Sequence, residues 1–134
     1  MTQRFQDELA LVRQRYPGAQ NGENWVLIPS YTLPVGRFNL ATTPLMFIVP
    51  VGYPSTGPDN FFVDVNLRLL DGSMPPAFNA NSNSSTGPAP IGGNWGWFSW
   101  HPQGWRPSAQ LQSGDNLLTF ISSAGACLRG EDTA

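Results

Sequence analysis

Ser99 and His101 are the side chains whose types and spacing in this sequence favour nucleophilic chemistry. In an extended segment, residues i and i+2 point to the same face, so we expect the hydroxyl and the imidazole to lie side by side and to share a hydrogen bond. A serine hydroxyl is a poor nucleophile without a neighbouring base, and histidine supplies a base near neutral pH. The pair therefore predicts Ser99 as nucleophile and His101 as general base. The competing interpretation is that the histidine only packs, because Ser-x-His is common by chance.

An acidic partner for the imidazole has to come from elsewhere in the chain. No Asp or Glu lies within ten residues of His101 on either side. The candidates for a third group that orients the ring are Asp59, Asp64, Asp71 and Asp115, and the sequence does not rank them.

Cys127, the single cysteine, is the alternative nucleophile. It lies near the inner face of a predicted C-terminal helix, where a thiol behaves as a small buried hydrophobe. Burial in apolar surroundings disfavours the thiolate that reacts, so we expect Cys127 to be unreactive. A single cysteine also excludes an internal disulfide.

Metal and nucleotide sites have little support in the residues present. One histidine and one cysteine cannot supply three or four soft ligands, and the acidic residues show no ligand spacing. The glycine-rich stretch at 91–96 lacks the lysine and the strand-to-helix context of a phosphate-binding loop. We therefore expect no metal and no cofactor.

Four of the five tryptophans lie between residues 92 and 107, at positions 95, 97, 100 and 105. Each large aromatic side chain buries roughly 150 to 250 Å². We therefore expect Trp105 and one of Trp95 or Trp97 to pack against a sheet. An exposed tryptophan cluster would instead favour a docking surface, or stacking on sugar rings in a carbohydrate-binding module.

Two helices are expected on either side of the strands. Residues 2–16 show helical spacing behind Thr2 as N-cap, with Phe5, Leu9, Val12 and Tyr16 on one face and Pro17 and Gly18 as the stop. Residues 113–130 predict a second helix, with Ser113 as the cap and Asp115 near its positive end. Its inner face would consist of Leu117, Phe120, Ile121, Ala124 and Leu128.

The middle of the chain predicts strands. Residues 25–34, 36–42 and 44–54 are extended candidates separated by Pro and Gly, and 61–70 alternate as in a strand with one covered face. Residues 71–94 have almost no periodicity and predict a functional or disordered loop. The order predicts an α+β fold, with an antiparallel meander of roughly four strands and the helices packed on one face or end of it.

Length and charge narrow the class of protein. A chain of 134 residues predicts one domain, residues 1–134. The net charge is -2 and the basic residues, all arginines, are scattered, so the charge pattern of a nucleic-acid-binding protein is missing. No signal sequence and no apolar run near 18 residues is present, so we expect a cytoplasmic protein that does not enter a membrane.

Several short motifs occur in a recognisable order. The stretch "LMFIVPVGYPSTGPDNFFV" contains Pro50, Tyr53, Pro54 and Pro58, and "WRP", residues 105–107, precedes the last predicted helix. Between them lie "DGSMP" at 71–75 and "FSWH" at 98–101. In this order the motifs resemble ubiquitin-conjugating enzymes, and more narrowly the bacterial branch called prokaryotic ubiquitin-conjugating family E, over residues 2 to about 128.

The resemblance implies a ubiquitin-conjugating (UBC-like) fold, shortened by the last two helices of the longer enzymes. It also implies that Tyr53, Pro54, Trp105 and Pro107 support the active-site loop, and that the acyl acceptor lies in the loop before Trp105. The family's cysteine is missing there, because no cysteine lies between Tyr53 and Trp105. Its His-Pro-Asn segment is missing too, and the asparagines at 79, 81 and 83 do not match it. With Ser99 as the acceptor in place of the cysteine, we expect an oxyester in place of the thioester.

The resemblance also implies partners. These are an activating enzyme that uses ATP, a ubiquitin-like protein, and a metalloprotease that trims it. Conjugating enzymes meet their activating enzyme through the N-terminal helix, whose outer face here would consist of Arg4, Gln6, Asp7, Arg13 and Gln14. The sequence leaves open whether the pathway serves phage defence.

Two alternatives remain at this point. The first is a conjugating-enzyme-like domain that has lost its chemistry and only docks the activating enzyme or the ubiquitin-like protein. The second is the carbohydrate-binding module, which explains the tryptophans but neither the Tyr-Pro turn nor the lack of a secretory signal.

Overall fold

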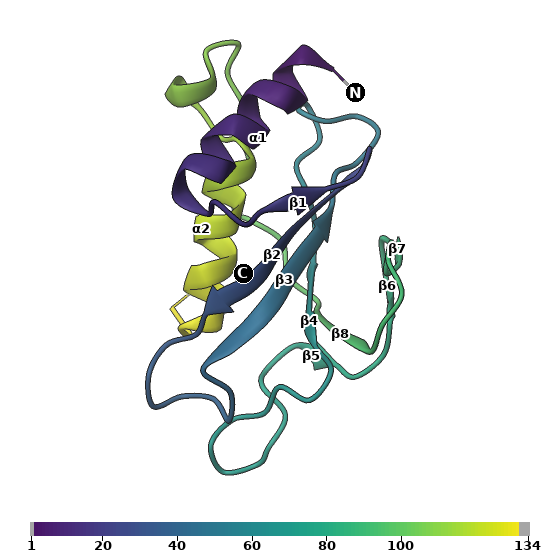
Figure 1. Ribbon diagram of the computed structural model, residues 1–134, viewed down its shortest axis with the longest axis vertical. Coiled ribbons are helices and arrows are strands. Elements are labelled where there is room, and N and C mark those ends of the chain that lie inside the picture. The colour runs from purple at the N-terminus through teal and green to yellow at the C-terminus, as the bar shows by residue number, and fades with distance from the viewer. Residues whose placement is uncertain (1, 132–134) are drawn as a thin grey trace.

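Two helices lie on one face of a six-stranded antiparallel sheet in the computed structural model, which describes residues 2–131 (Figure 1). Helix α1 spans Gln3–Arg15 and helix α2 spans Leu117–Leu128. The predicted α+β fold, with a helix before and a helix after an antiparallel sheet, is confirmed.

The sheet has the order β1-β2-β3-β4-β8-β5. Strand β5 lies in the region expected to be loop, and β8 lies in the tryptophan-rich stretch that follows it. The strands of this sheet are β1 (Gln20–Asn21), β2 (Trp25–Thr32), β3 (Thr42–Ile48), β4 (Phe61–Asp64), β8 (Trp95–Phe98) and β5 (Phe78–Asn79). A separate hairpin pairs β6 (Asn83–Ser84) with β7 (Gly87–Pro88). A short 3-10 helix, Leu111–Ser113, precedes α2.

The expected N-cap of α1 is confirmed, since the Thr2 hydroxyl accepts a hydrogen bond from the Phe5 backbone N–H at 3.1 Å. Phe5, Leu9 and Val12 are buried against the sheet, as the helical spacing predicts. Basic residues Arg13 and Arg15 lie in the last turn, where they favour the negative end of the helix dipole.

The predicted cap of the second helix is wrong, although its inner face is right. Ser113 ends the 3-10 helix, and Asn116 is the N-cap, accepting from the Thr119 backbone N–H at 3.0 Å. Thr119 completes a capping box through its hydroxyl, which accepts from the Asn116 backbone N–H at 2.9 Å. The inner face consists of buried side chains, as expected: Leu117, Phe120, Ile121, Ala124 and Leu128.

Two predicted strands are corrected. Of residues 36–42, only Thr42 belongs to a strand, as the first residue of β3. Residues 36–41 follow a turn at Gly36, whose φ is 81°, and contribute an isolated bridge from Phe38 to Leu69. The strand expected over 61–70 ends at Asp64, because residues 65–66 turn away from the sheet. Leu67 still reaches the core from this irregular segment and is fully buried.

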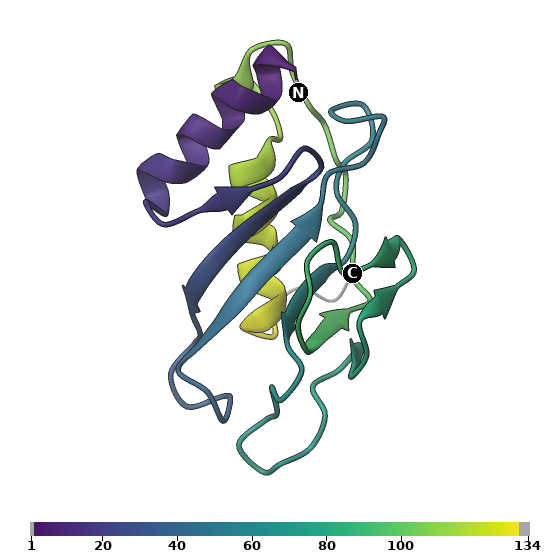
Figure 2. The same cartoon turned by 45° about the vertical axis from the view of Figure 1, so that its right-hand side comes forward.

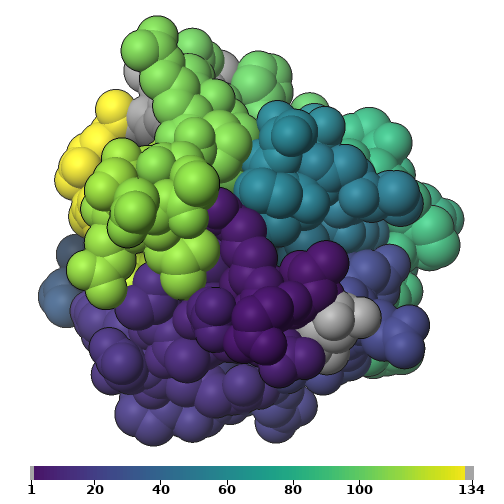
Figure 3. Space-filling view, turned by 90° about the horizontal axis from the view of Figure 1, so that it is seen from above, coloured from purple at the N-terminus to yellow at the C-terminus, as the bar shows by residue number. Residues whose placement is uncertain are grey.

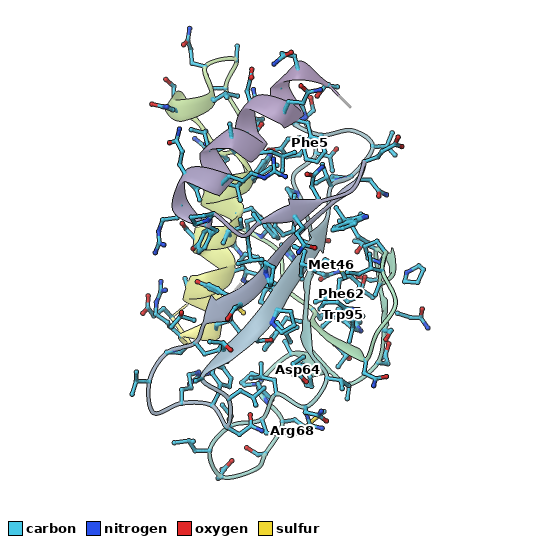
Figure 4. All side chains as sticks on the ribbon, viewed as in Figure 1. Phe5, Met46, Phe62, Asp64, Arg68 and Trp95 are labelled. Atoms are coloured by element: carbon cyan, nitrogen blue, oxygen red, sulfur yellow. The ribbon has the colours of Figure 1, made fainter. Side chains whose placement is uncertain are left out.

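Both faces of the sheet are covered, which corrects the expectation of one covered face for β4. Phe61 and Val63 lie in the core beneath the helices, whereas Phe62 is 1% exposed in a second cluster on the opposite face. That cluster also contains Leu27, Met46, Trp95 and Trp97. Figure 4 shows Met46, Phe62 and Trp95 together on the side of the sheet away from the helices, and Phe5 beneath α1.

The aperiodic stretch 79–94 covers the second cluster. It contains the β6–β7 hairpin, which lies on the side of the sheet opposite the helices (Figure 2). Ala89 and Ile91 pack against the cluster, and the Trp95 indole N–H donates to the Ile91 carbonyl at 3.1 Å. Because Trp95, Trp97 and Trp100 are buried, they offer no exposed platform on which sugar rings could stack.

A buried carboxylate joins the two helices at one end of the sheet. Glu8 of α1 is fully buried, and its Oε1 accepts from the Leu117 backbone N–H at 2.7 Å and from the Tyr53 hydroxyl. Its Oε2 lies 2.6 Å from Arg4 Nε. Without this carboxylate the Leu117 N–H and the Tyr53 hydroxyl would lose their acceptor, so Glu8 stabilises the junction of the helices and the loop after β3.

Replacing Glu8 with alanine should therefore destabilise the fold strongly. We expect Glu8→Ala to lower the free energy of unfolding by about 3 kcal/mol, because the substitution removes the acceptor of the Leu117 N–H and of the Tyr53 hydroxyl and the charged partner of Arg4 Nε. Glu8→Gln keeps an acceptor oxygen and should cost less. The measurement is urea unfolding, with Asp7→Ala, an exposed acid on the same helix, as the matched control at about 0.5 kcal/mol or less. Equal stability of Glu8→Ala and Asp7→Ala would contradict the role of this carboxylate.

Candidate active site

Ser99 lies immediately after β8, where the chain is held from both sides. Its backbone N–H donates to the Ala77 carbonyl at 2.9 Å, and the residue itself is exposed to solvent. On the other side, the next residue, Trp100, accepts from the Asn60 backbone N–H at 2.7 Å and donates to Asn60 Oδ1 at 3.0 Å. The backbone around Ser99 is therefore fixed although no regular strand continues there.

The two residues that hold this segment have left-handed backbone conformations. Asn60 has a φ of 63° and Ala77 a φ of 64°, and they are the non-glycine residues with positive φ in the described part of the chain. Such a conformation costs roughly 1–3 kcal/mol and persists where the surroundings over-determine it. Strain of this kind clusters at functional sites, so its occurrence on both sides of residues 99 and 100 favours a functional segment.

A cavity of about 310 Å³ adjoins Ser99. Its other lining residues are largely apolar: Arg37, Phe38, Pro75, Pro76, Ala77, Phe98, Trp100, Cys127 and Gly130. Cys127 is therefore half-buried at a cavity shared with Ser99, which corrects the expectation of a thiol hidden in the inner face of the helix. Both candidate nucleophiles belong to one site, a proximity that their separation in sequence did not indicate.

His101 faces Asp59. Its Nδ1 lies 3.8 Å from Asp59 Oδ1, and the two side chains are 66% and 46% exposed. Within residues 2–131 no hydrogen bond joins His101 to Ser99, so the expected bond between hydroxyl and imidazole is not formed in this structure. The catalytic roles of the two residues stay a prediction.

The other acidic candidates accept hydrogen bonds elsewhere, Asp64 and Asp71 from residues two positions on and Asp115 from Arg106 and Thr119. Asp64 Oδ1 accepts from the Asn66 backbone N–H at 2.8 Å. Asp71 Oδ1 accepts from the backbone N–H and the hydroxyl of Ser73, and these bonds lower the pKa of Asp71. Asp115 Oδ2 accepts from the Arg106 backbone N–H at 2.8 Å, and Oδ1 accepts from the Thr119 hydroxyl. Of the four acids, only Asp59 lies beside the imidazole.

The residues expected to support the loop do meet in the structure. The Trp105 indole N–H donates to the Pro54 carbonyl at 2.8 Å, and its ring lies 6.0 Å from the Tyr53 ring, centroid to centroid. A Cβ at Gly57 would overlap the Trp105 ring, so this position requires glycine. Pro107 forms an isolated bridge with Asp115. The loop after β3 and the segment before α2 are thus packed as one unit.

Arg4 is not on the outer face of α1, which corrects the expected docking surface. Besides its pairing with Glu8, its guanidinium donates to the carbonyl of Ser108 and, at 3.5 Å, to that of Asp115. Figure 3 shows the light-green segment before α2 beside purple α1 and the teal loop after β3. Arg4 therefore fixes this segment to α1. The residues of the expected face that remain exposed are Gln6, Asp7, Arg13 and Gln14.

Glu8 and Asn60 are structural contributors to the site that the sequence reasoning missed. Their burial depends on chain segments that are distant in sequence, Leu117 for Glu8 and Trp100 for Asn60. The one available signal was the position of Glu8 three residues after Phe5 and four after Arg4, on the flank of the apolar face.

Residues 2–131 contain no group of three or more His, Cys, Asp or Glu side chains that could hold a metal ion. Neither helix in this range is long and apolar enough to cross a membrane.

In a comparison with known protein families, residues 6–129 match prokaryotic E2 family E. Comparisons with curated proteins and with solved structures gave no match.

The buried hydroxyl of Tyr53 predicts a pH dependence of stability. Burial first, and the hydrogen bond to Glu8 next, raise the pKa of Tyr53 well above its ordinary value of 10.0. The stabilisation from this neutral phenol is therefore fully present below about pH 10 and is lost as the pH rises further, because only the unfolded tyrosine ionises there.

We expect Tyr53→Phe to flatten the decline in the free energy of unfolding above about pH 10, measured by urea unfolding across that range. A residual slope is expected from Tyr31, whose pKa is also raised by burial. An unchanged slope in Tyr53→Phe would contradict a neutral, buried Tyr53.

Proposed function

Because the chain belongs to prokaryotic E2 family E, we propose that it accepts the C-terminus of a ubiquitin-like protein as an oxyester on Ser99. Membership gives it a role in bacterial ubiquitin-like conjugation and implies contact with an E1-like activating enzyme and a ubiquitin-like modifier. The choice of Ser99, and of His101 as its base, is the further step. A metalloprotease that trims the modifier belongs to the same proposal and depends on the resemblance alone. A cytoplasmic location belongs to it too and depends on the sequence, which shows no signal sequence and no long apolar run.

One observation carries the proposal. Ser99 is an exposed residue beside a cavity of about 310 Å³, and it is the one hydroxyl-bearing residue among those that line this cavity. The position follows β8 and precedes the loop that Trp105 and Pro54 hold. A largely apolar cavity beside an exposed nucleophile can receive an extended peptide end and exclude water from the bond that forms.

The proposed step is a transfer from a thioester to an alcohol. The Ser99 oxygen attacks the carbonyl carbon of a thioester carried by the activating enzyme, and the hydroxyl proton passes to the imidazole of His101. The carbon–sulfur bond breaks, and the leaving sulfur takes the proton from the imidazolium. The products are the serine ester and a free thiol on the activating enzyme, so no oxidant or reductant is needed. The His101 side chain is 66% exposed, so turning toward Ser99 costs it little packing.

The test is incubation of the protein with activating enzyme, ATP and the ubiquitin-like protein, followed by intact-mass measurement. We expect an adduct that resists thiol and is cleaved by hydroxide, that persists in Cys127→Ala, and that is lost in Ser99→Ala. Ser99→Cys is the matched variant, because a thiol at the same position should give an adduct that thiol reagents cleave.

Two outcomes would overturn the proposal. An adduct that survives Ser99→Ala and disappears in Cys127→Ala would make Cys127 the acceptor, which the shared cavity permits. No adduct in any variant, with all components active, would favour a docking domain without chemistry. One observation supports the docking domain. In the structure, which describes residues 2–131, no hydrogen bond joins Ser99 to His101.

The conjugating enzyme and the docking domain would both bind the activating enzyme through α1, and this contact can be tested separately. Asp7→Arg reverses a charge on the exposed face of α1 and should weaken binding to the activating enzyme several-fold, mainly through slower association. Binding can be followed by surface-immobilised activating enzyme at low and high salt. Asp71→Arg, a charge reversal on the loop after β4, is the control. Equal binding by Asp7→Arg and Asp71→Arg would show that the activating enzyme does not dock on this face of α1.

A further inference from the structure

We infer that Asp59 is a positioning residue for His101, which holds the imidazole with its Nδ1–H toward the carboxylate and leaves Nε2 as the base. The inference rests on the proposed function of Ser99 and His101. It concerns a residue that the family resemblance does not assign, and it begins from an oxygen that the fold leaves without a partner.

Asp59 Oδ1 is that oxygen. It is inaccessible to solvent and accepts no hydrogen bond from any residue between 2 and 131, although the side chain as a whole is 46% exposed. A buried carboxylate oxygen without a donor is costly, and native structures seldom leave one unexplained. The nitrogen that faces it is Nδ1 of His101, at 3.8 Å.

A small side-chain rotation would complete the contact. An ordinary N–H···O bond is about 0.8 Å shorter than the present separation. His101 is 66% exposed, so its ring can make this movement without disturbing packed neighbours.

The backbones that carry the two side chains are fixed in register. Asn60 follows Asp59 and Trp100 precedes His101, and these two neighbours exchange two hydrogen bonds, at 2.7 Å and 3.0 Å. Asn60 Nδ2 also donates to the Ser85 hydroxyl at 2.7 Å. The Trp100 ring is buried between Phe61 and Phe120, with centroid distances of 5.6 Å to each. Asp59 and His101 are therefore placed opposite each other by the left-handed Asn60 and by the core.

The chemical consequence is the choice of tautomer. A neutral imidazole carries its proton on one nitrogen only, and the group that the other nitrogen contacts decides which. A carboxylate that accepts from Nδ1–H leaves the lone pair on Nε2, the arrangement that a base needs to take a proton from a serine hydroxyl. Without Asp59, nothing in the described chain would select this form.

The experiment uses the fact that the chain contains a single histidine, so its imidazole signals need no assignment. Nitrogen-15 NMR of the neutral ring in the free protein reports the tautomer ratio. We expect the Nδ1–H form to predominate in the wild type and in the control Asp71→Ala, and the Nε2–H form to gain in Asp59→Ala. Asp59 is nearly half exposed, so its replacement should leave the urea midpoint close to that of the wild type.

The second measurement is the rate at which the hydroxide-labile adduct forms, which should fall roughly ten- to a hundredfold in Asp59→Ala. An unchanged tautomer ratio in Asp59→Ala would overturn the inference, whatever the rate. A changed ratio together with no adduct in the wild type would support the contact and overturn the oxyester proposal, so the two failures are distinguishable.

Discussion

The carboxylate of Glu8 holds together the end of the molecule on which the other features depend. It accepts hydrogen bonds from the first residue of α2 and from Tyr53 in the loop after β3, and it pairs with Arg4 on its own helix. Arg4 in turn donates to carbonyls of the segment before α2. A charge buried this completely stabilises a fold only when its donors are all in place, so α1, α2 and these two connections are expected to form together.

Contacts with that junction and with the sheet hold the backbone of the candidate site in place. Tyr53, which donates to Glu8, also packs against Trp105, and Trp105 donates to Pro54. On the other side of the site, Asn60 and Ala77 hold the chain that follows β8 in place. A nucleophile is useful only when its surroundings restrict it to a productive geometry. Here the restriction acts on the backbone, while the side chains of Ser99 and His101 remain exposed.

The burial of Trp95, Trp97 and Trp100 identifies them as packing residues. Trp95 and Trp97 fill a second cluster on the face of the sheet away from the helices, and Trp100 lies in the core beneath the helices. Strand pairing of residues 95–98 with β4 and β5, together with large buried aromatic side chains, orders this segment rich in glycine and proline. These three rings therefore offer no exposed surface for stacking, and the segment that they order contains Ser99.

The sequence by itself determined the two helices, the inner face of each, the antiparallel sheet and the family, because helical spacing, capping residues and motif order are local properties of the chain. It did not determine that residues 95–98 form a strand between two others, that Cys127 and Ser99 line one cavity, or that Asp59 is the acid beside His101. It also placed Arg4 on the wrong face. These features depend on pairs of residues far apart in sequence, and only the packing of the whole chain brings such pairs together.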